Sequence, residues 1–200
     1  MTSTRRSFAL GLASIAVLAG CDRTAGAKPT FHFTDITGAE FARQLELPDV
    51  DGKPRSLADW KGKVTVVFFG YTQCPDVCPT TMAELAQIRK LLGADADKLQ
   101  TVFVTIDPER DTAEILKGYV ANFGPGVAAL RGNAEQTAAA AKEFKVFFAK
   151  VPGKSPGSYT MDHSAASFVF DPAGHVRLFV PYGGDTNNFA ADLKQLVALG

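Results

Sequence analysis

The chain is poor in cysteine, and neither sign of charge predominates in it. Three Cys in 200 residues are too few for a disulfide-stapled scaffold. Lys and Arg number 21, as do Asp and Glu, so the net charge is zero and excludes a protein that binds nucleic acid by charge alone. With 46% hydrophobic residues and 15 Phe, the composition is that of a globular chain of one domain, neither collagen-like nor disordered.

The N-terminal apolar run, residues 8–19, is too short for a transmembrane helix, which needs about 20 residues. It follows Arg5 and Arg6 and leads into the tetrapeptide Leu-Ala-Gly-Cys, whose cysteine is Cys21. A basic start, a short apolar segment and small residues after it predict a secretory signal in residues 1–20. The two arginines fit either an ordinary basic start or a twin-arginine export signal.

The tetrapeptide resembles a bacterial lipobox, which would make Cys21 the lipid-modified first residue of the mature protein. We therefore expect an exported lipoprotein on the periplasmic side of the cytoplasmic membrane, a compartment that permits disulfides. Removing residues 1–20 takes away two positive charges and no negative one, so the net charge falls from 0 to −2. Residues 21–40 are expected to form the anchor and tether, and residues 41–200 one domain. His32 is assigned no role.

The order of the expected elements is that of a thioredoxin-like α/β fold. Continuous apolar runs at residues 64–69 and 101–106 predict strands buried on both faces of a mostly parallel sheet. The other elements are an N-terminal hairpin extension around Asp51-Gly52, helices at 79–92, from Asp111 to Gly124, at 133–144 and 188–198, and a hairpin of 167–170 with 176–180. A capping box of Asp111 and Glu114 is expected to open the second of these helices. Alternating strands and helices that end in a hairpin and a helix predict this fold.

Cys74 and Cys78 lie between a predicted strand and a predicted helix, where α/β folds place their sites. At a helix N-terminus the pKa of a thiol is expected to fall, which favours the thiolate. Three residues separate the pair, whereas thioredoxin-type oxidoreductases have two. The spacing alone leaves open a structural disulfide, a redox pair and a metal site.

His163 favours the metal site, because in a thioredoxin-like fold the loop that precedes residues 167–170 lies against the cysteine loop. Two thiolates and an imidazole suit Cu(I), and Cu(II) could add a water or a carboxylate. Structural zinc usually takes four protein ligands. Asp162 is a candidate fourth ligand, or an acceptor that orients an imidazole. His175 lies in a predicted turn and is assigned no role.

Three motifs together resemble the Sco/SenC family. They are Cys-Pro-Asp-Val-Cys-Pro from residue 74, Asp-Pro-Glu-Arg-Asp-Thr from residue 107 and Asp-His-Ser from residue 162. The resemblance spans about residues 45–198 and implies a membrane-anchored, thioredoxin-like copper protein whose ligands are Cys74, Cys78 and His163. It further implies a role in maturing the CuA site in subunit II of cytochrome c oxidase, by delivering copper or by reducing the cysteines of that site. Many relatives have a transmembrane helix where this chain has a lipobox.

The second motif allows two interpretations. A strand that ends in Asp107-Pro108 before a capped helix is ordinary boundary chemistry. Alternatively, Asp107 and Arg110 shape the copper pocket or contact the partner protein.

Two other functions remain open at this stage. One is a thiol–disulfide oxidoreductase that keeps client cysteines reduced, with Cys74 and Cys78 as its redox pair. The other is a peroxide-reducing enzyme, although peroxiredoxins usually place a Thr three positions before the reactive Cys and Thr72 is two before Cys74. For the copper protein, a Cys74–Cys78 disulfide would exclude the metal, so redox state would control loading. We expect a monomer.

Overall fold

A computed structural model describes residues 29–200, so the predicted signal in residues 1–20 and the predicted lipidation site, Cys21, lie outside the described residues. The centre of the fold is a six-stranded sheet in the order β1-β10-β9-β4-β5-β6. Its strands are β1 (Thr34–Asp35), β4 (Val64–Gly70), β5 (Leu99–Thr105), β6 (Val127–Leu130), β9 (Ala166–Phe170) and β10 (Val176–Pro181). β4, β5 and β6 are parallel, and the other pairings are antiparallel.

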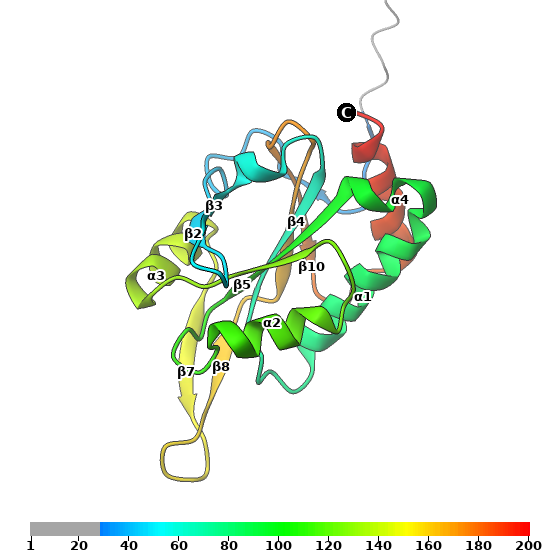
Figure 1. Cartoon of the computed structure of the whole chain (residues 1–200). Helices are drawn as coiled ribbons and strands as arrows, with labels where there is room; N and C mark the ends of the chain where they lie inside the picture. The colour runs from blue at the N-terminus through cyan, green and yellow to red at the C-terminus, as the bar shows by residue number, and fades with distance from the viewer. Residues whose placement is uncertain (1–28) are drawn as a thin grey trace, which may run out of the picture.

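Helices cover both faces of this sheet. They are α1 (Val77–Leu91), α2 (Ala113–Ala121), α3 (Ala134–Glu143) and α4 (Thr186–Val197), with short 3-10 helices at Leu57–Trp60 and Gly93–Lys98. α1 and α4 pack together on one side of the sheet, and α3 lies on the other (Figure 1). The mixed sheet between helices confirms the predicted α/β class.

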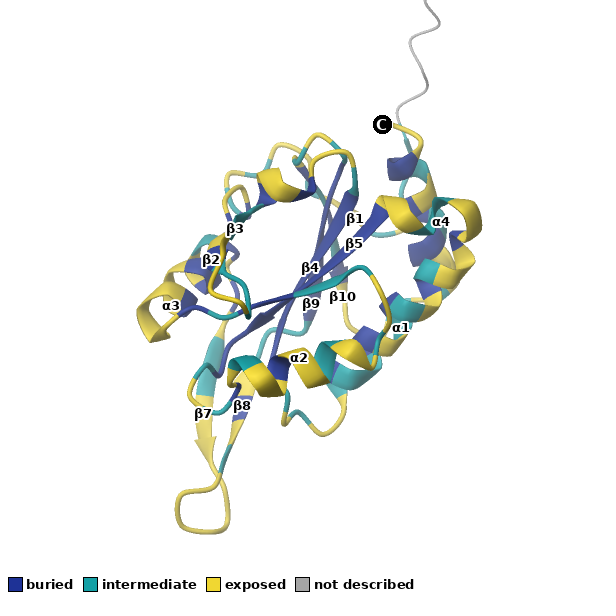
Figure 2. Cartoon of the chain, in the orientation of Figure 1, coloured by how far each residue is buried: buried dark blue, intermediate teal, exposed yellow. Residues whose placement is uncertain are grey.

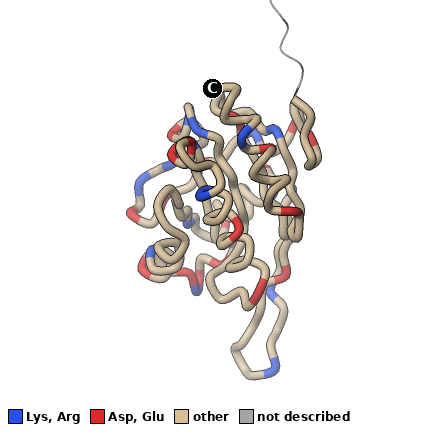
Figure 3. Tube along the Cα trace, turned by 90° about the vertical axis from the view of Figure 1, so that its right-hand side faces the viewer, with Lys and Arg blue, Asp and Glu red and all other residues tan. Residues whose placement is uncertain are grey.

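The apolar sequence of β4 explains its central place. All seven residues of β4 and all seven of β5 are buried, as expected of strands covered on both faces (Figure 2). Side chains alternate along a strand, so neighbours pack on opposite faces. On one face, the ring of Phe68 lies 6.3 Å from that of Phe103. On the other, the ring of Phe69 lies 5.0 Å from that of Phe144, the residue directly after α3. Figure 3 shows basic and acidic positions interspersed along the chain, in keeping with its zero net charge.

Two hairpins stand outside the central sheet. β2 (Glu46–Pro48) and β3 (Pro54–Ser56) form the expected N-terminal hairpin. β7 (Phe148–Pro152) and β8 (Tyr159–His163) form a second hairpin that projects from the molecule (Figure 1). The sequence analysis missed this second hairpin, because its strands carry polar and exposed residues instead of a continuous apolar run. It also missed the short strands β1 and β6.

Three helix starts differ from the expectation. α4 begins at Thr186 and not at residue 188, with Asp185 as its N-cap. α1 begins at Val77 and not at Pro79, which is compatible with the proline because the N–H groups of a first helical turn have no partner within the helix. The predicted capping box of Asp111 and Glu114 is wrong. Thr112 is the N-cap of α2, and its side chain accepts a hydrogen bond from the Ile115 N–H. Asp111 is instead fully buried.

The folded domain includes residues before position 41. β1 pairs with β10, and the carboxylate of Asp192 in α4 holds the chain just before β1. This buried carboxylate accepts hydrogen bonds from the backbone N–H groups of His32 and Phe33, at 2.9 and 3.0 Å, and lies 2.7 Å from His32 Nδ1. His32, which the sequence analysis left without a role, therefore ties the start of the domain to its last helix.

We predict that Asp192→Ala destabilises the domain by about 1–3 kcal/mol, because it removes a charged acceptor and leaves two partly buried backbone hydrogen bonds unmade. Chemical denaturation followed by circular dichroism measures this change. Asp95→Ala, which removes an exposed carboxylate, should stay within about 0.5 kcal/mol of the native protein. Equal effects of the two substitutions would contradict the assigned role of Asp192.

Candidate metal centre

The cysteine loop joins the carboxyl end of β4 to the first turn of α1. Gly70 ends the strand, and a Cβ at this position would lie 2.9 Å from Cys78 Sγ, so the thiol packs directly against the strand backbone. Cys78 lies in the first turn of α1, and its backbone N–H donates to Cys74 Sγ at 3.3 Å. Both cysteines are free thiols; Cys78 is buried and Cys74 is half-buried. The start of the helix thus brings both sulfur atoms to one place.

His163, at the end of β8, completes the cluster. Its Nε2 lies 3.5 Å from Cys78 Sγ, and its Nδ1 lies 3.0 Å from the carbonyl oxygen of Ser164. Because a carbonyl oxygen can only accept, Nδ1 carries the proton and Nε2 is left as a ligand atom. The ligand atoms of Cys74, Cys78 and His163 all lie within 4.8 Å of one another. The structure therefore assembles the three side chains that the sequence analysis singled out.

Asp162 lies neither at the position of a fourth ligand nor beside the imidazole as its acceptor. It is exposed, and because side chains alternate along a strand it projects from the face of β8 opposite to His163. The Ser164 carbonyl, not a carboxylate, is the acceptor for the imidazole. His175 is exposed in the turn between β9 and β10, as expected, with its Nδ1 3.7 Å from Asp171.

Burial dominates the protonation of the site. It raises the pKa of the Cys78 thiol well above its usual range, against the opposing effect of a hydrogen bond from the Tyr71 backbone. The expectation that the helix start lowers the pKa is therefore wrong for Cys78, because loss of solvent outweighs the helix effect. Burial also lowers the pKa of His163, which favours the neutral imidazole. Without a cation, Cys78 is a poor thiolate nucleophile; a bound cation would compensate the charge of the ionised sulfur.

The carboxylate of Asp111 links the cysteine loop to the sheet through hydrogen bonds. This carboxylate accepts hydrogen bonds from the N–H and hydroxyl of Thr72, the hydroxyl at 2.6 Å, and from the hydroxyl of Thr105 at 2.5 Å. Burial raises the pKa of Asp111, although these hydrogen bonds act in the opposite direction. The sequence analysis placed Asp111 in a helix cap, and no pattern in the local sequence indicated its contact with residue 72.

Asp107 lies in the same segment and contacts β8. Its carboxylate accepts a hydrogen bond from the Tyr159 hydroxyl at 2.8 Å and forms an ion pair with Arg110. These contacts reach the strand that carries His163, so they favour the interpretation in which Asp107 and Arg110 shape the pocket over that of boundary chemistry alone.

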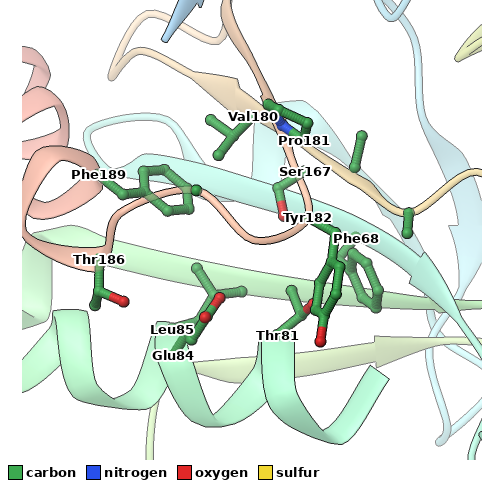
Figure 4. A pocket seen from close by; sticks show the side chains of 13 residues that line it. Phe68, Thr81, Glu84, Leu85, Ser167, Val180, Pro181, Tyr182, Thr186 and Phe189 are labelled. Atoms are coloured by element: carbon green, nitrogen blue, oxygen red, sulfur yellow. The ribbon is translucent and has the colours of Figure 1, made fainter. Parts of the chain in front are cut away.

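A small cavity lies beside the cluster, beyond Phe68, whose ring is 6.2 Å from that of His163. Figure 4 shows Thr81, Glu84 and Tyr182 around it. Its volume of about 20 Å³ holds roughly one water molecule, so it does not accommodate an organic substrate.

The fold and the cluster define a class: thioredoxin-like domains with two cysteines and a histidine gathered at the carboxyl end of a central strand. Comparison with known proteins agrees. The SCO1/SenC family model matches residues 33–198, and the chain belongs to this family. Among the residues that the structure describes, none of the helices is long and apolar enough to cross a membrane.

Individual relatives support the assignment. The mitochondrial SCO2 homolog of Mus musculus is 38% identical over 142 residues, which make up 70% of this chain and 54% of that protein. The chain spans about half the length of several curated relatives that it matches. The structure of Bradyrhizobium japonicum ScoI with copper bound is 38% identical, with a TM-score of 0.69 over 76% of this chain and 97% of that one. Apo Sco1 of Thermus thermophilus is 35% identical, with a TM-score of 0.74 over 86% and 99%. These similarities confirm the thioredoxin-like fold.

The raised pKa of Asp111 predicts a pH dependence of stability. Below the ordinary value of 3.8 the carboxyl is protonated in both folded and unfolded chains, and its contribution is fully present. As pH rises from 3.8 through the raised pKa, the unfolded chain releases the proton first, and stability is lost. Asp111→Asn removes this titration, so the native protein should lose stability relative to the variant over a window that begins near pH 4 and ends above the raised pKa.

Urea denaturation at several pH values measures this difference. Asp95→Asn, which changes a side chain that is 46% exposed, is the control and should leave the pH profile of the native protein unchanged. A native-minus-Asp111→Asn difference that stays constant across the window would rule out the assigned effect of burial.

Proposed function

We propose that the protein is a copper metallochaperone that binds one Cu(I) through Cys74, Cys78 and His163. The observation that carries this proposal is the convergence of two thiols and the free Nε2 of an imidazole within 4.8 Å. Thiolate and imidazole ligands suit Cu(I), and three ligands satisfy it, whereas structural zinc usually takes four. The family membership and the likeness to a copper-bound relative support the same metal.

The cysteines and His163 have different roles in binding the metal. Cys74 and Cys78 lose their protons when the cation binds, so loading releases protons and strengthens with pH. His163 contributes Nε2 without losing a proton, because its lowered pKa keeps the ring neutral and Ser164 holds the Nδ1 proton. Cysteines of an acceptor protein can then replace these ligands one at a time. A disulfide between Cys74 and Cys78 would leave the metal without either thiolate ligand, so the pair can bind copper only while both cysteines are reduced.

We further propose that the protein is an exported, monomeric lipoprotein anchored at Cys21, whose client is the CuA site in subunit II of cytochrome c oxidase. The family membership supports the client. The start of the described chain lies against the last helix, where the carbonyl of Thr30 accepts a hydrogen bond from Gln195. This end of the molecule lies away from the β7–β8 hairpin (Figure 1). An anchor there would leave the cluster open to a partner.

Anaerobic titration of the reduced protein with Cu(I) against a competing chelator tests the proposal. We predict one tight equivalent. Cys74→Ser, Cys78→Ser and His163→Ala should each weaken binding by about 100-fold or more, beyond the roughly 10–100-fold effect of losing a group that only orients a ligand. His175→Ala is the matched control, because it removes an exposed imidazole and should leave the affinity unchanged.

Retention of tight copper binding by either cysteine variant would refute the ligand assignment. Absence of tight binding by the native protein, together with turnover of a protein disulfide, would instead support the thiol–disulfide oxidoreductase.

A further inference from the structure

Arg110 connects three segments that meet at the cluster. Its Nη1 donates to the carbonyl oxygen of Tyr159 at 2.8 Å, at the start of β8, and to the side-chain oxygen of Gln73 in the cysteine loop at 3.2 Å. Its Nε donates to Asp107, directly after β5. One guanidinium therefore joins the sheet, the cysteine loop and the hairpin that carries His163.

The contact with Tyr159 is the most extensive of the three. The guanidinium carbon lies 3.6 Å from the centre of the Tyr159 ring, and the Tyr159 hydroxyl donates to the same Asp107 that pairs with Arg110. Tyr159 and His163 share one face of β8, because residues four apart in a strand point to the same side. Fixing Tyr159 therefore also fixes the face of the strand that presents His163 to the cysteines.

The hairpin needs this support because no backbone ladder attaches it to the central sheet. In the described part of the chain, β7 and β8 pair only with each other. Besides Arg110, the neighbouring contacts are a hydrogen bond between the Tyr71 hydroxyl and the Met161 backbone, and the rings of Tyr71 and Phe68, at 6.1 and 6.2 Å from that of His163. The chain enters β9 three residues after His163 and so fixes that end of β8, whereas the Tyr159 end is held by side chains such as Arg110.

We propose that Arg110 is a positioning residue that holds His163 in reach of the metal bound by Cys74 and Cys78. This inference rests on the proposed function. Arg110 touches none of the three ligand atoms and acts through Tyr159 and β8. Its Nη2 is buried and has no acceptor among the described residues, an arrangement that costs stability and is typical of functional sites. Without Arg110 the hairpin would shift, and copper would keep its two thiolates but lose the imidazole.

A double-mutant cycle tests the inference. Arg110→Gln should weaken Cu(I) binding about 10–100-fold in the native background, the range measured for groups that orient a ligand. In the His163→Ala background it should cause no further loss, because the ligand that Arg110 positions is already absent. Arg110→Lys, which keeps the charge but not the planar fork, should recover part of the affinity.

Lys150→Gln is the matched control. The Lys150 ammonium also lies over the Tyr159 ring, at 4.8 Å, and pairs with Glu109, but among the described residues it makes no hydrogen bond to the cysteine loop. Lys150→Gln removes one positive charge, as Arg110→Gln does, and should bind copper as the native protein does. Equal losses from Arg110→Gln in both backgrounds, or no loss in the native one, would overturn the inference.

A second measurement does not depend on copper. In the metal-free protein, Arg110→Gln should move the ring resonances of His163 towards those of the exposed His175, and Lys150→Gln should not. Unchanged His163 resonances in Arg110→Gln would overturn the positioning role. Failure of the native protein to bind copper would instead refute the proposed function, and the resonances would still decide the role of Arg110.

Discussion

Burial of the Cys78 thiol is the constraint on which the site depends. The sulfur lies in the first turn of α1 against the backbone of Gly70, where a larger residue would collide with it. Burial in this position raises the pKa of the thiol, so the metal-free cluster is held as a neutral thiol beside a neutral imidazole. A buried cation would reverse that balance, because its charge stabilises ionised sulfur. The same packing that keeps the thiol inert without metal thus suits it to bind one.

The elements around Cys78 follow from the need to bring distant segments to one strand end. β4 is central because it is apolar on both faces, and its carboxyl end is therefore surrounded by the ends of its neighbours. Asp111, after β5, accepts hydrogen bonds from Thr72 in the cysteine loop. Asp107, from the same segment, accepts one from Tyr159 in the hairpin. Two carboxylates four residues apart therefore support the two sides of the cluster.

The parts that the sequence predicted well are those with a strong local pattern. The continuous apolar runs predicted β4 and β5, and the structure confirms the helix expected at residues 133–144 as α3. The cluster itself followed from residue chemistry and from the place of each residue in an α/β order. The β7–β8 hairpin was missed because pairing and side-chain contacts, not apolar periodicity, stabilise it. The roles of Asp111 and Tyr159 depend on contacts between residues 39 and 52 positions apart, which no local pattern contains.

The fold holds the two kinds of ligand differently, and this bears on how a bound metal could be passed on. The cysteines are packed against the core. Cys78 Sγ lies against the backbone of Gly70 at the end of β4, and Cys74 Sγ accepts a hydrogen bond from the Cys78 N–H. His163 belongs to a hairpin outside the central sheet, which is held by the short link to β9 and by side-chain contacts. Displacing the imidazole would disturb a few side-chain contacts, whereas displacing Cys78 would disturb the start of α1. On the proposed function, an incoming cysteine would therefore take the position of His163 first, while both thiolates still retain the copper.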